Sequence, residues 1–472
     1  MIKIKSWFSK EIQDEYLEEI GVEIKSNNII NPKFKEYYKK RFSELRKKEF
    51  NTLSNAEKKE YKQNYLKRKK VDIEFLPGKK IDLRTLLIGT REEVFNVDGI
   101  KEYFGIIKLN NNLGSLSMEA FLNILSELYP DKIKVEFSEN ELIYTLDQDS
   151  VSVPKNSNKR ISYKKMSPFY IFFLRKIKIA LNQTIINQNN YSFGQFKAEL
   201  KNTQQYVKDS TLINYDLISE DKRHELLESL KIKCCPYCNR QYITIWFDEN
   251  NSVHSTADLD HFYQKTIYPL FALSLFNFVP SCQICNSRMK GSKTIKTLYP
   301  YEEGMDEFKF RCKPKDGGIE DLVDLWLANK TNDPKKLLDK YKLELYDDSD
   351  KDTDIKHIQR IKGSKEVFHL EEVYQTHLEA AINEMLKIRI YFSGDYSKYA
   401  KKTLDDIGLK NDNDSTTTGD SDVHSKSKFS EDEMRDIILG FVYDGQDKLD
   451  QPLGKMLSDI FENELENKQI YD

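Results

Sequence analysis

The chain has 472 residues, about three times a typical domain length, and its 39% hydrophobic content is enough to form buried cores. A net charge of −3 excludes a chain that is basic throughout, and no apolar run is long enough to span a membrane. The first residues, MIKIKSWFSK, hold no apolar leader, so we expect a cytoplasmic protein without membrane contact.

The first 215 residues divide into a basic part and a mixed part. We expect residues 1–95 to form a basic helical region, because apolar residues recur at helical spacing among the lysines of residues 33–70. This basic face either contacts nucleic acid or is only a solvated helical surface. Residues 96–215 should form a mixed α/β region whose role the sequence does not reveal. Within it we expect a helix over 117–128, strands over 133–137 and 141–146, and a helix that opens at Ser167-Pro168.

The last part of the chain, residues 313–472, has mostly helical patterns. A polar linker interrupts it at residues 411–428, where too few apolar residues are present to form a core. Between the outer regions, a helix over about 221–230 leads into a cysteine-rich segment, and we place a central domain at residues 216–312. The predicted fold class is α+β: a mostly helical chain with one small central domain.

Four of the six cysteines form two C-x-x-C pairs, Cys235 with Cys238 and Cys282 with Cys285. Each pair places two thiolates on one tight turn, and four thiolates suit a tetrahedral Zn²⁺ with no open position, which is a structural metal. In an intracellular protein this pattern favours metal binding over disulfides. The alternatives are buried free cysteines or a redox pair. The two remaining cysteines are expected to be spectators, although the first rivals its neighbour Cys235 as a ligand: Cys234 and Cys312.

The 43 residues between the cysteine pairs have the pattern of a hairpin. Residues 241–247 are β-branched and aromatic, residues 248–251 form a turn, and residues 253–262 return as a second strand. The second strand ends in Asp258-Leu259-Asp260-His261. Strand side chains normally alternate between two faces, but a distorted strand end can aim an adjacent carboxylate and imidazole into one cleft.

Phosphodiester hydrolysis needs a base for water and a cation at the phosphate, and this segment holds candidates for both. His261 titrates near neutral pH and is the candidate base. Oxygen ligands from Asp260 and Asn286 suit Mg²⁺ or Mn²⁺. Asp258 is a further candidate ligand, although a surface carboxylate is the commoner role for such a residue. The basic residues that follow are candidates to hold the phosphate of a nucleic acid: Arg288, Lys290 and Lys293.

The string DLDHFY, followed by YPLFALSLFNFVPSCQICNSRMKG, resembles the ββα-metal HNH endonucleases. Together with the CPYCNR opening, it is similar to a bacterial phage-defence subgroup, the Septu-type HNH nucleases. The resemblance covers residues 230–312 well and residues 430–465 faintly, the latter through the QPLGK segment at 451–455. Residues 1–215 resemble no family.

The resemblance assigns roles residue by residue. Asp260 matches a metal ligand, and His261 matches the general base. Asn277 matches the asparagine that orients that histidine and its loop, and Asn286 matches the second metal ligand. The family often has histidine at this last position, so Asn286 is a departure that bears on metal preference. The cysteine pairs match the zinc knuckles that many HNH domains carry.

The favoured prediction is a metal-dependent HNH endonuclease that hydrolyses phosphodiester bonds in DNA, with a zinc-stapled ββα-metal domain and a catalytic Mg²⁺ or Mn²⁺. The resemblance also implies an anti-phage effector with a companion ATPase or sensor protein. Two alternatives stay open: a zinc module that binds nucleic acid without cutting it, and an RNase with the same centre. The other histidines match no motif and are expected at the surface or in the core: His224, His254, His357, His369, His377 and His424.

Overall fold

The computed structural model describes residues 1–26, 72–138, 141–154, 163–185, 187–207, 213–250, 252–291, 293, 296–315, 338–350, 353–392 and 448–468. The fold is mixed α+β, with helices joined to small antiparallel sheets. The basic segment at 33–70 and the polar linker at 411–428 lie outside the described residues. Among the described helices, none combines the length and the apolar character that crossing a bilayer requires.

The N-terminal part contains a β-hairpin that the helical prediction for residues 1–95 missed. Strand β1 pairs antiparallel with β2, and Gly78 (φ 76°) in the tight turn between them adopts a conformation that suits glycine. Alternating burial along β1 places Ile73 and Phe75 in the core. The elements of this part are α1 (Lys10–Ser26), β1 (Asp72–Leu76), β2 (Lys79–Asp82), α4 (Leu83–Ile88), α5 (Arg91–Phe95) and α6 (Ile100–Asn111).

A three-stranded sheet and three helices follow, largely as the sequence predicts. The expected helix begins after its N-cap Ser117, and both expected strands are present with a third strand added. The helix expected to open at Pro168 starts a turn earlier and contains this proline, because Met166 in that turn is fully buried. The elements are α7 (Met118–Leu128), β3 (Ile133–Ser138), β4 (Glu141–Leu146), β5 (Asp149–Pro154), α8 (Tyr163–Ala180) and α9 (Phe193–Thr203).

The central segment consists of short elements. Helix α10 matches the helix expected at about 221–230 and is capped by Ser219. The elements are the 3-10 turns η2 (Gln204–Tyr206), η3 (Tyr215–Leu217), η4 (Pro269–Phe271) and η5 (Leu275–Asn277), helix α10 (Glu220–Ser229), strands β6 (Ile245–Phe247), β7 (Val253–Ser255), β8 (Ala257–His261) and β9 (Phe278–Cys282), and the π-helix η6 (Ile284–Lys290).

The hairpin expected between 241–247 and 253–262 is only partly present. Strands β6 and β7 pair over three residues, and the chain then bends at Thr256, whose hydroxyl accepts a hydrogen bond from the Thr244 N–H. Strand β8 pairs with β9 instead, a strand that the sequence did not predict. Pro280 within β9 argues against a strand by pattern, but a two-stranded sheet tolerates proline because each strand is an edge. Strands β8 and β9, followed by η6, form a ββα unit.

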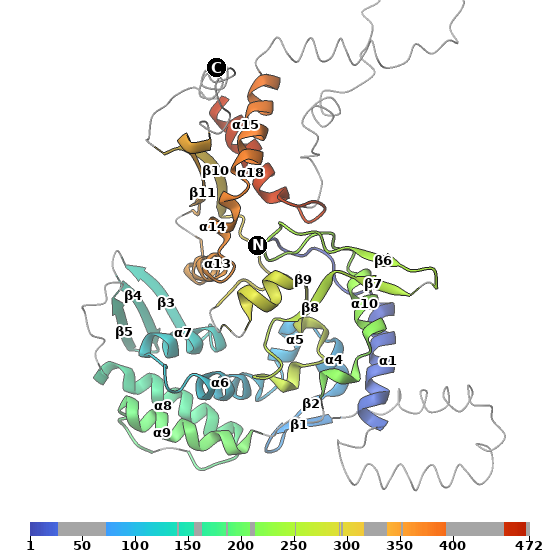
Figure 1. The fold of residues 1–472 in the computed structure, drawn as a ribbon. Coiled ribbons are helices and arrows are strands. Elements are labelled where there is room, and N and C mark those ends of the chain that lie inside the picture. Colours follow the sequence, from blue (N-terminus) through green and yellow to red (C-terminus); the bar gives the residue numbers. More distant parts are fainter. Residues whose placement is uncertain are drawn as a thin grey trace, which may run out of the picture.

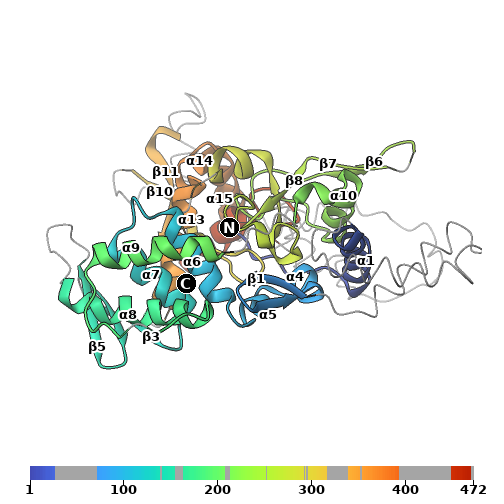
Figure 2. The same cartoon turned by 90° about the horizontal axis from the view of Figure 1, so that it is seen from below.

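The C-terminal part adds a β-hairpin to the expected helices. Strands β10 and β11 pair over seven residues each, which adds a strand pair to a described region that is mostly helical, as expected for residues 313–472. Figure 1 shows β8 and β9 in the middle of the molecule, between these C-terminal elements and α4 and α5. Helix α10 lies beside α1 in both views (Figures 1 and 2). The elements are β10 (Phe308–Pro314), β11 (Tyr341–Asp347), α13 (Ile355–Val367), α14 (Leu370–Gln375), α15 (Leu378–Phe392) and α18 (Gly454–Lys468).

Candidate metal centre and active site

The four paired cysteines meet in one buried cluster. The ligand atoms of Cys235, Cys238, Cys282 and Cys285 all lie within 4.8 Å of one another. Zinc–sulfur bonds of about 2.3 Å in a tetrahedron need sulfur separations of about 3.8 Å, so the four thiols fit this ion. The four cysteines are therefore placed to bind a structural Zn²⁺, as the sequence predicts.

The two remaining cysteines lie outside this cluster. Cys234 forms an isolated β-bridge with Tyr242, and Cys312 lies in β10 opposite Leu343. Burial raises the pKa of the Cys234 thiol to about 12, which keeps it protonated. Among the described residues, the metal-binding group contains neither of them, so Cys235 and not Cys234 is the ligand.

Distant segments hold the first cysteine knuckle in place. Asn239, directly after Cys238, has a left-handed backbone (φ 49°) that asparagine tolerates better than most residues. Its backbone carbonyl accepts from the Leu453 N–H at 2.6 Å, and its Oδ1 accepts from the Lys455 N–H at 2.9 Å. The Tyr374 hydroxyl donates to the Cys238 carbonyl at 2.7 Å. The QPLGK segment thus docks onto the CPYCN turn.

Two polar contacts join strand β8 to η6. Asp258 and Asp260 point to the same face of the strand, and Asn286 and Lys290 lie about one helical turn apart. Asn286 Nδ2 donates to Asp258 Oδ2 at 3.0 Å. Lys290 Nζ donates to both oxygens of Asp260, at 2.8 and 2.7 Å, and the Tyr237 hydroxyl donates to Asp260 Oδ2 at 2.6 Å. Asn286 thus contacts Asp258, whereas Asp260 is buried between Lys290 of η6 and Tyr237 of the first cysteine knuckle.

His261 is the last residue of β8, and its imidazole packs against two aromatic rings. Its Nε2 lies 2.9 Å from the Ala272 carbonyl, and its ring packs edge-on against Tyr215 and Phe278 at 4.6 and 5.2 Å. Burial lowers the pKa of His261 to about 4, so the imidazole is neutral at neutral pH. A neutral ring that donates from Nε2 keeps Nδ1 as an acceptor, which is the state that a general base requires.

Asn277 is fully buried and forms hydrogen bonds to the loop that contains Ala272, whose carbonyl contacts His261. Its Oδ1 accepts from the Tyr263 N–H at 2.6 Å, and its Nδ2 donates to the carbonyls of Tyr263 and Phe271, each at 2.9 Å. Phe271 directly precedes Ala272, whose carbonyl contacts His261. Asn277 therefore positions the histidine through the loop, not by a direct bond, and acts as a positioning residue.

Three residues near His261 were not predicted from the sequence. The Tyr215 ring contacts His261 and is covered by two cations, with Lys265 Nζ at 4.0 Å and the Arg223 guanidinium carbon at 5.2 Å. Burial raises the pKa of Tyr215, and the negative charge of Asp258 contributes in the same direction. Tyr215 thus packs against the imidazole, and Arg223 and Lys265 lie over the Tyr215 ring. Only Lys265 is near the motif in sequence, so the other two required the fold.

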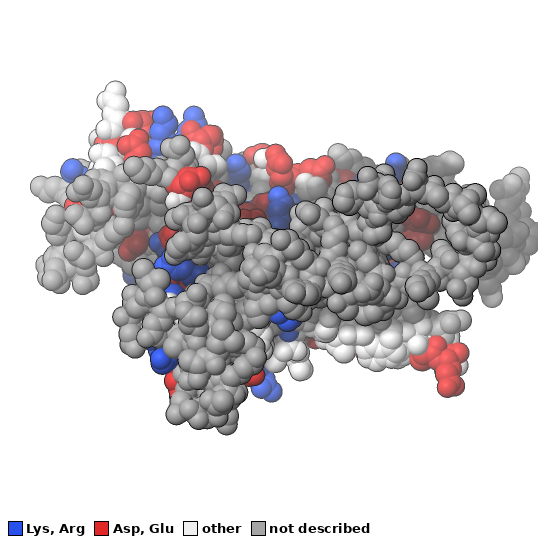
Figure 3. Space-filling model, turned by 90° about the horizontal axis from the view of Figure 1, so that it is seen from above, with Lys and Arg blue, Asp and Glu red and all other residues white. Residues whose placement is uncertain are grey.

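The three expected phosphate-binding residues differ in their exposure to solvent. Arg288 and Lys293 are exposed, as a phosphate contact requires, whereas Lys290 is only 6% exposed and its ammonium also donates to the His261 carbonyl at 2.6 Å. On the face seen from above, both Lys or Arg and Asp or Glu residues appear among the described residues (Figure 3). Phosphate binding at this centre would therefore rest on Arg288 and Lys293 together with Arg223 and Lys265.

We predict that Lys290→Met lowers the free energy of unfolding by about 3–5 kcal/mol, because it leaves the buried Asp260 carboxylate without a cation. Urea denaturation followed by circular dichroism measures this loss. The double variant Lys290→Met/Asp260→Asn should be more stable than Lys290→Met alone, and Lys293→Met is the exposed control. Equal stability of Lys290→Met and the wild type would show that this ion pair contributes nothing.

The chain was compared with protein-family models, curated proteins and solved structures, and no match was found in any of the three. Within the described structure, the buried cluster of two C-x-x-C pairs is consistent with a zinc site.

Proposed function

We propose that the chain is a metal-dependent endonuclease of the HNH type that hydrolyses phosphodiester bonds in DNA. The observation that carries the proposal is His261, a neutral imidazole oriented by the Ala272 carbonyl at the end of a ββα unit. The zinc cluster would hold the junction between β9 and η6, because Cys282 ends β9 and Cys285 lies in η6. A structural metal thereby fixes the strand and the helix that carry the polar residues.

In the proposed reaction, His261 Nδ1 takes a proton from water as the water oxygen attacks phosphorus. The bond to the 3′-oxygen breaks in line with the attack, and the departing 3′-oxygen takes a proton from solvent water, which leaves a 5′-phosphate and a 3′-hydroxyl. Arg223, Lys265 and Arg288 lie around or beside this centre and would hold the negatively charged backbone. Tyr215 limits the rotation of the imidazole by packing against its ring.

A divalent cation, Mg²⁺ or Mn²⁺, would polarise the scissile phosphate and offset its developing charge. Asn286 is one proposed ligand. The sequence pattern names Asp260 as the other, but the hydrogen bond from Asn286 to Asp258 supports Asp258 as a carboxylate at the same place. Asp260 would first have to release Lys290 and Tyr237.

We expect Asp258→Asn and Asp260→Asn to have different effects. If Asp258 is the ligand, Asp258→Asn raises the Mn²⁺ concentration for half-maximal cleavage at least about tenfold and leaves stability unchanged, because Asp258 is partly exposed. Asp260→Asn should instead lower stability, since it removes the counter-charge of buried Lys290. Cleavage titrations with Mn²⁺ and urea denaturation of both variants measure the difference. A metal requirement altered only by Asp260→Asn would restore Asp260 as the ligand.

The substrate class is tested by incubating the purified chain with supercoiled plasmid, single-stranded DNA and tRNA in parallel, with Mg²⁺ or Mn²⁺. Metal-dependent nicking of plasmid is the expected result. Cleavage of tRNA alone would favour the RNase alternative. The family resemblance adds that the enzyme acts in phage defence with a companion ATPase or sensor protein. Adding such a partner is the second arm of the experiment.

The second candidate function is a zinc module that binds nucleic acid without cutting it. Burial of Asp260 against Lys290 and Tyr237 favours it, because this carboxylate is not free for a metal in the present conformation. Such a module would bind plasmid DNA in a gel-shift assay and leave it intact with either metal, with and without a partner.

The low pKa of His261 predicts a contribution to acid sensitivity. Burial lowers this pKa to about 4 in the folded chain, whereas an unfolded histidine has a pKa near 6.5. Between these values only the unfolded state binds the proton, so this residue's stabilising effect is present above pH 6.5 and is lost as the pH falls toward 4. The loss should reach roughly 2 kcal/mol at pH 5.

The measurement compares urea denaturation of the wild type and His261→Gln at pH 7.5 and pH 5. Other groups, the cysteines included, titrate in both proteins, so the difference between the two pH dependences isolates His261. Identical pH dependences would mean that the imidazole is solvated in the folded chain.

A further inference from the structure

A cavity of about 560 Å³ lies next to the ββα unit; Lys290, whose ammonium contacts the His261 carbonyl, and Lys293 form part of its lining. Three parts of the chain line it: the α5–α7 region, residues 262–303, and helix α13. Its volume falls within the range of small-molecule sites, about 300–1,000 Å³. Single ligands of nucleotide size are therefore the right scale for it, whereas a nucleic-acid duplex is much too wide.

Positive charge dominates the described lining. Eight lysine and arginine side chains face four glutamates there. Glu127 is already shared by Lys296 at 2.9 Å and Lys108 at 3.8 Å, and Glu303 accepts from Arg360. Glu302 also pairs with Arg91, so three of the four carboxylates are engaged within the protein, and the excess of positive charge attracts an anion.

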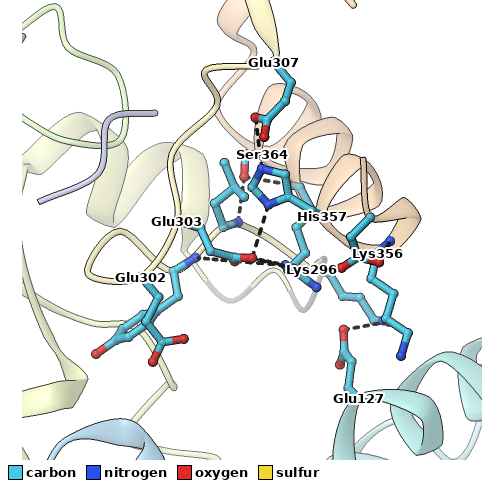
Figure 4. Close-up of polar contacts among 12 residues, drawn as sticks. Glu127, Lys296, Glu302, Glu303, Glu307, Lys356, His357 and Ser364 are labelled. Carbon is cyan, nitrogen blue, oxygen red and sulfur yellow. Dashed lines mark hydrogen bonds and ion pairs between the residues drawn. The ribbon is translucent and has the colours of Figure 1, made fainter. Parts of the chain in front are cut away.

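The cations of this cavity are poorly hydrated, which strengthens their attraction for an anion. Burial lowers the pKa of Lys296, and repulsion from Lys108 and Arg360 adds to the effect. Burial and the nearby Arg360 likewise lower the pKa of Lys356, whose ammonium donates to the Ser126 carbonyl at 3.1 Å. Figure 4 shows Lys296 and Lys356 facing Glu127 of α7, with Glu303 and His357 on the other side. A bound anion would offset this crowded positive charge.

Aromatic rings complete the lining beside the cations. Phe104 stacks on Tyr268 with ring centroids 4.6 Å apart, and both line the cavity together with Phe95 and Tyr299. Lys108 Nζ lies 5.4 Å from the Phe104 ring. Cations for phosphate and aromatic faces for a planar ring are the two features that recognise a nucleotide.

We propose that this cavity binds a phosphorylated small molecule of the nucleotide class. The phosphates lie among Lys296, Lys356 and Arg360, and the ring lies toward Phe95, a lining ring that is partly exposed. This inference does not depend on the nuclease proposal, because none of these residues contacts His261, Asp258 or Asn286 in the polar contacts described above. The site offers the chain a means of responding to nucleotide concentration.

The test is calorimetric titration of the full zinc-loaded chain with ATP, GTP, adenosine and inorganic phosphate, without added divalent cations. We expect binding of a nucleotide, with adenosine and phosphate each at least about tenfold weaker. The bound nucleotide should also raise the melting temperature. No heat and no thermal shift with either nucleotide would overturn the proposal. So would binding of a single-stranded oligonucleotide alone.

Matched variants locate the binding. Lys356→Gln and Lys296→Gln should each weaken nucleotide binding at least about tenfold. Lys362→Gln is the control, because Lys362 lies on the same helix as Lys356, is 61% exposed and does not line the cavity. The melting temperature without ligand shows whether each variant is folded, and Lys356→Gln carries the test if Lys296→Gln is not. Unchanged affinity in a folded Lys356→Gln would place any bound nucleotide elsewhere.

Discussion

His261→Ala should lower the rate of plasmid cleavage by about 10²–10⁴-fold, the range for losing a general base. The imidazole is held neutral by burial and oriented by the Ala272 carbonyl, so its Nδ1 is available to accept the proton from water. Removing the ring leaves the cysteine cluster and the bond between Asp258 and Asn286 in place. Single-turnover cleavage, with zinc content and circular dichroism measured alongside, checks the prediction.

The matched control for this variant is His369→Asn. His369 is exposed and has a left-handed backbone (φ 47°), a conformation that asparagine also adopts. It should cleave at the wild-type rate. Wild-type activity in His261→Ala would refute the assignment of the base. Full DNA binding by His261→Ala without cleavage would separate catalysis from recognition.

Cys285→Ser should release zinc and unfold the ββα unit, at a cost of several kcal/mol in the free energy of unfolding. A serine hydroxyl is a poor zinc ligand, and three thiolates leave the ion with an open position. Cys285 lies in η6 directly before Asn286, so the loss also removes the helix that faces Asp258 and Asp260. We therefore expect cleavage and zinc to be lost together.

Metal analysis and chelator-induced unfolding measure this effect. The wild type should retain about one zinc ion per chain, and a strong chelator should unfold it. Cys312→Ser is the control, because Cys312 lies in β10 outside the cluster, and it should keep its zinc. A Cys285→Ser protein with normal zinc and stability would mean that the four thiols do not act as one metal site.

Local patterns predicted the features that depend on neighbours in sequence. The helix expected over 117–128, strands β3 and β4 and the two C-x-x-C pairs follow from short-range rules, and the structure contains all of them. The pairing of β8 with β9 did not follow, because Pro280 breaks the strand pattern and the partner lies beyond a long loop. The hairpins β1–β2 and β10–β11 were missed for a different reason: charged residues alternate with apolar ones along these strands, and this pattern was not read as a strand.

The candidate site shows the same division. The sequence identified His261, Asn277 and Asn286, but not which polar groups face them. The partner of Asn286 is Asp258, and Lys290 pairs with Asp260 instead of projecting toward solvent. Long-range contacts decide such pairings, and a single sequence holds no information on them. That Asp260, His261 and Asn286 converge on one cation therefore stays a prediction. The Asp258→Asn and Asp260→Asn variants test it.

Docking of the QPLGK segment on the zinc knuckle has a consequence for biosynthesis. Asn239 bonds to Leu453 and Lys455, more than 200 positions later in the chain. During translation, the knuckle emerges from the ribosome long before these partners do, so its native packing waits until they have been synthesised. A truncated product that ends before residue 448 would carry His261 and all four thiols without these packing contacts.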